Sequence, residues 1–218
     1  MTDPYLAVHA PRYGLLIEKV RELAPPEPRI LDVAPSYEAE QLRRLPAVVD
    51  SLGFRDPRFA PAGGERHIDF DLRDAGRHEL WPDLADYDVV VCAEVLEHVP
   101  VSPVDVLLLL VAAVRPGGWL VLQTPNAARI SNRLRLLRGR SPFELPREGG
   151  GQPAHFREYT VDELLAAARE AGLEPGGWLT ASYFVTGSRG NAVARRLGPL
   201  VPRSLRAGIT AWFRRPPR

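Results

Sequence analysis

The sequence has little of several features that would narrow its function. Cys92 is the only cysteine among 218 residues. A single cysteine excludes a disulfide framework within the chain and a zinc site built from several cysteines. No stretch approaches the roughly 20 consecutive apolar residues of a membrane-spanning helix, and the start of the chain lacks the basic-then-apolar pattern of a signal peptide. We therefore expect a soluble, cytoplasmic protein with no membrane span.

Net charge is also nearly absent, at +1, so composition gives no reason to expect a nucleic-acid partner. The charge is unevenly distributed, because residues 189–218 contain eight arginines and no acidic residue. A second basic run, 129–140, has the spacing of an amphipathic helix. Such segments are candidates for peripheral contact with an anionic membrane. The commoner outcome is a solvated helix whose apolar stripe packs on the protein body.

Glycine is missing where it would be most informative. The segment "RILDVAPSYE", residues 29–38, reads as a short apolar strand that ends in an acid and a turn. A nucleotide-binding α/β protein has a glycine-rich loop at this place, because the backbone approaches the ligand closely and adopts positive φ. Here Ala34, Ser36 and Glu38 stand at the three glycine positions. The loop by itself argues against a dinucleotide site.

What is present is an alternation of short apolar runs with helical patterns. Strands are expected at 30–34, 47–50, 68–72, 87–93, 119–124, 173–180 and 208–214, and helices at 11–24, 37–45, 104–114, 130–137, 160–171 and 191–197. The space between the second and third strands lacks a full helix. Continuous apolar strands are typical of a parallel sheet covered on both faces. The sequence thus predicts a doubly wound α/β fold in a single domain, 1–218.

Acidic residues stand at four predicted strand ends: Asp32, Asp50, Asp71 and Glu94. Ligands of open α/β sheets bind at the carboxyl ends of the strands. Asp50 follows Asp32 by about the separation that is usual between a glycine loop and the acid that holds ribose hydroxyls. Each acid could instead cap a helix or be solvated, but four in succession favour a binding site.

Three further segments carry a family resemblance: "CAEVLEHVP" (92–100), "VRPGGWLVLQTPN" (114–126) and "HFREYTVDELLAAAREAGLE" (155–174). Together they resemble class I S-adenosylmethionine-dependent methyltransferases, especially those acting on small molecules and glycans. The resemblance covers roughly residues 28–180. It implies a Rossmann-like sheet with an antiparallel last strand, S-adenosylmethionine as cofactor, and O-methylation of a hydroxyl on a sugar, lipid-linked or secondary-metabolite acceptor.

Two other functions remain open at this point. An inactive pseudo-methyltransferase could serve as a binding or scaffold subunit if the glycine-free loop no longer admits the cofactor. A nicotinamide-dependent oxidoreductase is disfavoured because the phosphate-binding glycines are absent. S-adenosylmethionine has no phosphate and so does not need that cradle of backbone amides. The substituted loop therefore alters the expected cofactor pocket without closing it.

The resemblance also implies roles for individual residues. Asp32 matches the acid near the methionine amino group, Asp50 the acid that holds the ribose, and Asp71 the residue near the adenine amine. The full set of cofactor-binding positions that it implies is Asp32, Ala34, Ser36, Asp50, Asp71, Leu72, Cys92, Ala93 and Glu94.

The acceptor side is less defined. His98 and His155 are the candidate general bases, because only histidine has an unperturbed pKa near neutrality; each could instead pack or cap structurally. Arg157, Tyr159 and Asn126 are candidates for acceptor binding; Arg157 and Tyr159 could equally tether their loop to the body. We expect residues 127–159 to form an inserted cap over the acceptor cleft. No ligand cluster is evident, so no metal is expected.

Overall fold

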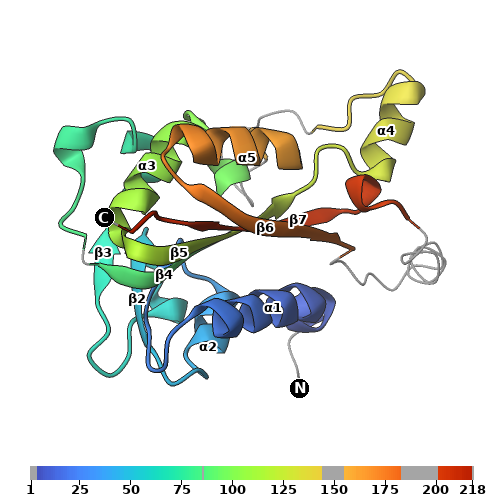
Figure 1. The fold of residues 1–218 in the computed structure, drawn as a ribbon. Coiled ribbons are helices and arrows are strands. Elements are labelled where there is room, and N and C mark those ends of the chain that lie inside the picture. Colours follow the sequence, from blue (N-terminus) through green and yellow to red (C-terminus); the bar gives the residue numbers. More distant parts are fainter. Residues whose placement is uncertain (1–3, 85, 144–154, 183–200, 218) are drawn as a thin grey trace.

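The computed structural model describes residues 4–84, 86–143, 155–182 and 201–217, with side chains from residue 8 onward. These residues form a seven-stranded sheet in the order β3-β2-β1-β4-β5-β7-β6 (Figure 1). The strands are β1 (Arg29–Val33), β2 (Val48–Gly53), β3 (His67–Asp69), β4 (Tyr87–Ala93), β5 (Val114–Pro125), β6 (Glu174–Ala181) and β7 (Gly208–Arg214). Strands β1 to β5 pair in parallel, and β7 is antiparallel to both of its neighbours. The doubly wound sheet with an antiparallel last strand is confirmed.

Helices cover both faces of the sheet (Figure 1). Helices α1 (Pro4–Leu23) and α2 (Tyr37–Leu42) lie on one face, and α3 (Pro103–Ala113) and α5 (Val161–Glu170) lie on the other. Helix α4 (Ile130–Leu137) projects at one end of the molecule. No helix in the described ranges is long and apolar enough to cross a membrane.

Strand β4 shows why the apolar residues of a strand in this sequence follow one another instead of alternating with polar ones. Val90 and Cys92 pack in the core that includes α3 and α5, whereas Val89 and Val91 pack in the core against α1. Successive side chains of a strand point to opposite faces, and here both faces are covered. A strand buried on both sides needs apolar residues at every position, which is the pattern that predicted a parallel sheet.

Several element boundaries differ from those expected. Helix α1 begins at Pro4, so Pro11 lies inside it rather than at its start. Strand β2 continues past Asp50 to Gly53, β3 is shorter than predicted, and α2 ends at Leu42. Helix α3 ends at Ala113, and the "RPGG" segment belongs to β5, where the register with β4 shifts.

Other boundaries match the expectation or fall outside the described residues. The bounds of β4, α4 and β7 agree with those predicted. Between β2 and β3 the chain forms only the short 3-10 turn Pro57–Phe59, which confirms the missing helix. The helix expected at 191–197, and residues 144–154 of the expected cap, lie outside the described residues.

Candidate active site at the carboxyl edge of the sheet

A cavity of about 850 Å³ opens where the parallel strands end. Its size lies within the range of small-molecule and cofactor sites. The lining comes from α1, from the segments that follow β1, β2, β3 and β4, and from the loop before α5; the residues are His9, Arg12, Ala34, Ser36, Glu38, Gly53, Phe54, Asp56, Phe70, Asp71, Leu72, Arg73, Ala93, Glu94, Val95, His98, Val99 and His155. Segments far apart in the sequence therefore meet at the edge where α/β proteins bind ligands.

The glycine-free loop keeps the backbone shape that glycine normally provides. Ala34 has a φ of 55°, in the left-handed region that glycine favours. Its N–H donates a 2.7 Å hydrogen bond to the carbonyl of Leu52. Gly53 lies so close that a Cβ on it would be 3.2 Å from the Ala34 Cα. The first glycine of the expected motif has been replaced by alanine without a change in the turn that it serves.

Beyond Ala34, the loop places a carboxylate inside the cavity. Ser36 precedes α2, and its hydroxyl donates a 2.5 Å hydrogen bond to Glu38. Glu38 is 1% exposed and lies 3.9 Å from the Arg12 guanidinium of α1. Burial raises the pKa of Glu38, while the bond from Ser36 and the charge of Arg12 oppose that rise. Helix α1 thus supplies the cation that balances the charge of Glu38 in this loop.

Glu94 and Asp32 are acids with buried oxygens that have no hydrogen-bond partner among the described residues. Glu94 lines the cavity with a φ of 58°, and its Oε1 atom has no partner. Both carboxylate oxygens of Asp32 also lack a hydrogen-bond partner among the described residues, and that side chain is fully buried. Burial raises the pKa of each carboxyl. Because buried polar groups are normally paired, Glu94 is suited to receive a positively charged ligand group such as the amino group or sulfonium of S-adenosylmethionine.

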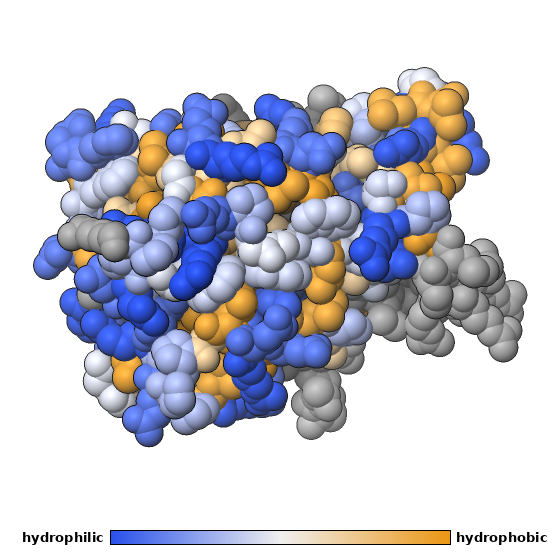
Figure 2. All heavy atoms as spheres, viewed as in Figure 1, coloured by the Kyte–Doolittle hydropathy of each residue, from blue (hydrophilic) through white to orange (hydrophobic). Residues whose placement is uncertain are grey.

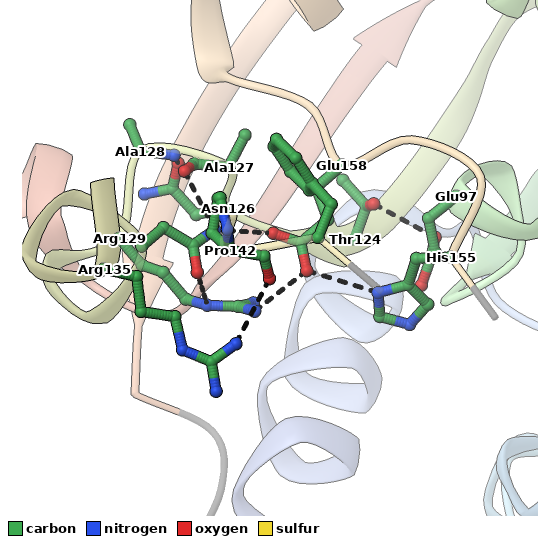
Figure 3. Close-up of polar contacts among 12 residues, drawn as sticks. Glu97, Thr124, Asn126, Ala127, Ala128, Arg129, Arg135, Pro142, His155 and Glu158 are labelled. Atoms are coloured by element: carbon green, nitrogen blue, oxygen red, sulfur yellow. Dashed lines mark hydrogen bonds and ion pairs between the residues drawn. The ribbon is translucent and has the colours of Figure 1, made fainter. Parts of the chain in front are cut away.

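The two histidines lie together on the cavity wall. The rings of His98 and His155 have centroids 4.8 Å apart and are steeply tilted. His155 Nδ1 lies 3.2 Å from the carboxylate of Glu158 (Figure 3). A carboxylate accepts a hydrogen bond from a protonated Nδ1, and in that tautomer Nε2 is the ring atom that can accept a proton. The arrangement is that of a histidine oriented by an acid.

Glu158 is itself held in place from the other side. The Nη2 of Arg129 lies 2.9 Å from it, and the Asn132 side-chain amide donates a 2.9 Å hydrogen bond to it (Figure 3). Burial alone would raise the pKa of Glu158, but the bond to His155 and the charge of Arg129 outweigh it and lower the pKa. Glu158 is therefore ionised, and its carboxylate can accept a hydrogen bond from His155. Sequence reasoning missed this residue, although it lies within the "HFREYT" segment.

Backbone hydrogen bonds fix this segment against the end of β4. The N–H groups of Phe156 and Arg157 donate to the carbonyl of Glu97, at 2.8 and 3.3 Å. The following helix starts at a capping box in which Thr160 and Glu163 bond each other's backbone. The "CAEVLEHVP" and "HFREYT" segments therefore form one structural unit.

The same unit contains a group that could hold a metal ion, which sequence reasoning did not expect. Ligand atoms of Glu97, His98 and His155 all lie within 4.8 Å of one another. Glu97 is fully buried and accepts a 3.0 Å hydrogen bond from Thr124. Burial, together with the charge of Glu94, raises the pKa of Glu97 to about 8. Carboxylate and imidazole are ordinary ligands of divalent cations.

Eight of the predicted site residues line the cavity: Ala34, Ser36, Asp71, Leu72, Ala93, Glu94, His98 and His155. Asp32 and Cys92 are fully buried behind this wall. Burial raises the pKa of the Cys92 thiol, so it is a neutral core residue. Asp71 reaches the cavity, but its carboxylate caps the following 3-10 turn and pairs with Arg73.

The placement of Asp50 at a strand end was wrong. Asp50 lies in the middle of β2, opposite Leu31 of β1. Its carboxylate accepts hydrogen bonds from the Tyr87 hydroxyl at 2.8 Å and the Arg66 N–H at 2.8 Å. Tyr87 is the first residue of β4, so Asp50 faces the amino edge of the sheet, away from the cavity. The error arose because β2 continues for three residues that looked like the start of a loop.

The three predicted acceptor contacts also lie outside the cavity wall. Arg157 pairs with Glu163 at 2.5 Å, and Tyr159 is 3% exposed within the core. The Asn126 amide donates to the carbonyls of Ser204 and Arg206. All three tether segments to the body, which was the alternative interpretation of Arg157 and Tyr159.

Several wall residues had no clear signal in the sequence. They are His9 and Arg12 from α1, Phe54 and Asp56 after β2, and Phe70 and Arg73 near β3. An acid does follow β2, but it is Asp56, whose carboxylate binds Arg58. A strand predicted to continue to Gly53 would have placed Phe54 and Asp56 directly after its carboxyl end, where ligand-binding residues are expected.

Comparison with known proteins identifies the family. A model of a methyltransferase domain matches residues 9–177. Ubiquinone biosynthesis O-methyltransferase of Bordetella bronchiseptica is 35% identical over 187 residues, which are 83% of this chain and 75% of that protein. The enzyme of the same name from Bordetella avium is 35% identical over 122 residues, 56% of this chain. That match spans about half of the relative, 49% of its length.

Solved structures show the same fold at low identity. A S-adenosylmethionine-dependent methyltransferase from Mesorhizobium loti superimposes with a TM-score of 0.61 at 16% identity, covering 91% of this chain and 96% of that one. The 1,6-didemethyltoxoflavin-N1-methyltransferase of Burkholderia thailandensis, with S-adenosylhomocysteine bound, gives a TM-score of 0.56 at 17% identity, covering 94% and 77%. The fold and the sequence match agree: the chain belongs to the methyltransferase domain family.

Proposed function

We propose that this protein is an O-methyltransferase acting on a hydroxyl of a sugar, lipid-linked or secondary-metabolite acceptor, with His155 as the general base. The observation that carries the proposal is the contact between His155 and Glu158 on the wall of the cavity that contains Glu94. An oxygen acceptor needs a base to remove its proton, whereas the methyl group of the cofactor is already activated. The relatives named O-methyltransferases support oxygen as the atom methylated.

The cofactor end of the cavity is assigned to the segments after β1 and β4. S-adenosylmethionine, when bound, supplies a methyl group on a sulfonium. Glu94 offers a buried carboxylate oxygen to the positive charge of the methionine part. The backbone at Ala34 and the hydroxyl of Ser36 border the same space. Phe54 and Phe70 provide apolar surface for the purine, a contact of the kind that aromatic rings make with bases.

At the acceptor end, the chain's own residues hold and move one proton. Because Glu158 accepts a hydrogen bond from Nδ1–H of His155, Nε2 would be the ring atom that accepts the proton of the acceptor hydroxyl. His98, whose ring lies against His155, limits the orientations open to that imidazole. Alignment of acceptor and methyl group in line accounts for most of the remaining rate enhancement.

The assignment is tested by transferring labelled methyl groups from S-adenosylmethionine to a panel of hydroxylated sugars, lipid-linked phenols and secondary metabolites. We expect His155→Ala to lower turnover by about 10²- to 10⁴-fold, the usual contribution of a general base, while cofactor affinity measured by calorimetry stays the same. His78→Ala, which removes a histidine whose ring lies tilted against Trp81 outside the cavity wall, is the matched control.

A His155→Ala variant with full turnover would remove that residue as the base. The inactive scaffold reading is tested by the same titration. A folded wild-type sample that gives no heat with millimolar S-adenosylmethionine would favour it over the enzyme. Replacing Glu158 with Gln separates the orienting role of Glu158 from the proton-accepting role of His155. The variant should lower turnover less than His155→Ala and should shift the pH profile of the reaction.

A further inference from the structure

Helix α4 is oriented opposite to the usual surface helix. Its buried residue is polar: Asn132 is 2% exposed and faces the body. The Asn132 amide donates to the carbonyl of Ala127 at 3.0 Å and to Glu158 at 2.9 Å. These hydrogen bonds, rather than apolar packing, attach the helix to the domain. The expectation that its apolar stripe packs on the body is wrong.

The apolar side chains of α4 face outward instead. Ile130, Leu134 and Leu137 recur at the spacing that places residues on one helix face, and they are 46%, 42% and 83% exposed. Phe143, just beyond the helix, is 48% exposed. Figure 2 shows hydrophobic residues gathered over α4 at the upper right of the molecule, beside strongly hydrophilic ones. An exposed apolar stripe of this kind marks an interaction surface.

The charge around this stripe has a single sign. Residues 129–140 contain five arginines and no acidic residue. Arg129 binds Glu158, whereas Arg133 and Arg135 bond backbone carbonyls of neighbouring residues. Hydrogen bonds to carbonyls leave the positive charge of a guanidinium unneutralised. A surface that combines apolar side chains with arginines is complementary to an anionic membrane interface.

We propose that α4 docks on an anionic lipid surface, with Ile130, Leu134 and Leu137 entering the boundary between headgroups and acyl chains and the arginines contacting lipid phosphates. A second copy of the chain fits less well, because a symmetric pairing of two α4 faces brings arginines against arginines. The proposed docking surface belongs to α4 alone, so lipid binding does not depend on which acceptor the enzyme methylates.

Docking at α4 would place the lipid surface next to the candidate base. Arg129 at the start of the helix and Asn132 within it both bind Glu158, and Glu158 binds His155 (Figure 3). The helix is thereby linked to the cavity wall through two contacts. An acceptor that enters from a membrane would approach the enzyme on this side.

The test is sedimentation of the full-length protein with vesicles of phosphatidylcholine, with and without about 30% phosphatidylglycerol. We expect binding to the anionic vesicles alone, and its loss at high salt because screening weakens the attraction. The double variant Leu134→Glu, Leu137→Glu should abolish binding. Leu80→Glu, at a leucine that is 48% exposed in another part of the chain, is the matched control and should bind like wild type.

Charge is tested separately by replacing Arg138 and Arg140 with Gln. Each replacement should lower the partition coefficient about fivefold, since one basic residue near an anionic surface contributes about 1 kcal/mol. Thermal melts show that each variant is folded. The proposal is overturned if wild type fails to sediment at roughly 1 mM anionic lipid, or binds neutral and anionic vesicles equally. It is also overturned if light scattering finds a dimer that the double leucine variant converts to a monomer.

Discussion

Replacing Ala34 with glycine tests whether the substituted loop is strained. Ala34 holds a φ of 55°. For an L-residue other than glycine this conformation costs about 1–2 kcal/mol. Glycine removes that cost but adds about 0.5–1 kcal/mol of chain entropy to the unfolded state. The balance is a gain of roughly 0.5–1 kcal/mol in the free energy of unfolding. For a chain of this size we expect a rise in melting temperature of about 1–4 °C.

The measurement is thermal unfolding followed by circular dichroism, with two matched controls. Glu27 also has a positive φ, 50°, but it is exposed in the loop before β1. Glu27→Gly should stabilise the protein by a similar amount. Ala39 lies in α2 with its side chain buried, so Ala39→Gly should destabilise it by about 1 kcal/mol or slightly more.

Cofactor binding distinguishes the loop at Ala34 from the control loop at Glu27. Because the turn at Ala34 borders the cavity, Ala34→Gly should bind S-adenosylmethionine at least as tightly as wild type in calorimetry. Glu27→Gly should leave the affinity unchanged. A fall in melting temperature for Ala34→Gly equal to that of Ala39→Gly would refute the reasoning, because it would show that the alanine methyl contributes more than the backbone conformation costs.

Three further changes test the assignments. Asp50→Asn should lower the free energy of unfolding by about 1–3 kcal/mol, because Tyr87 and its other partners lose a charged acceptor, yet leave affinity for S-adenosylmethionine unchanged in calorimetry. Burial raises the pKa of Asp50, but hydrogen bonds from Arg66 and Tyr87 lower it on balance; its contribution is therefore present above the unfolded carboxyl pKa and lost as pH falls through the folded pKa. Wild type should lose more stability than Asp50→Asn in acid melts, and equal losses would contradict the network. Gly53→Ala should lower the free energy of unfolding by about 1–3 kcal/mol, seen as a lower urea midpoint, because φ is 133° and the added methyl meets the Ala34 Cα; an unchanged midpoint would exclude the close approach. Thr160→Ala should cost about 1 kcal/mol through loss of the α5 cap, seen as a lower melting temperature.

The site could be predicted from the sequence in part. Glu94, His98 and His155 were identified because their segments carry a family resemblance, and the structure places all three on the cavity wall. Asp50 was misplaced because the polar residue inside β2 looked like the end of the strand. Charged residues inside a strand that is buried on both faces are unusual, and this one accepts a hydrogen bond from Tyr87, 37 residues away. No local pattern contains that contact.

The sequence by itself determined the sheet and its helices, since two-sided burial requires continuous apolar runs such as β4 and caps such as Thr160 are local. It also determined the family, through short segments whose residues are adjacent in the chain. Only the tertiary structure decided that Arg12 reaches the cavity and that Glu158 orients His155. Only the tertiary structure shows that the apolar face of α4 points outward. A helical period shows that a face is apolar but not what lies beside it, because that depends on contacts between residues distant in sequence.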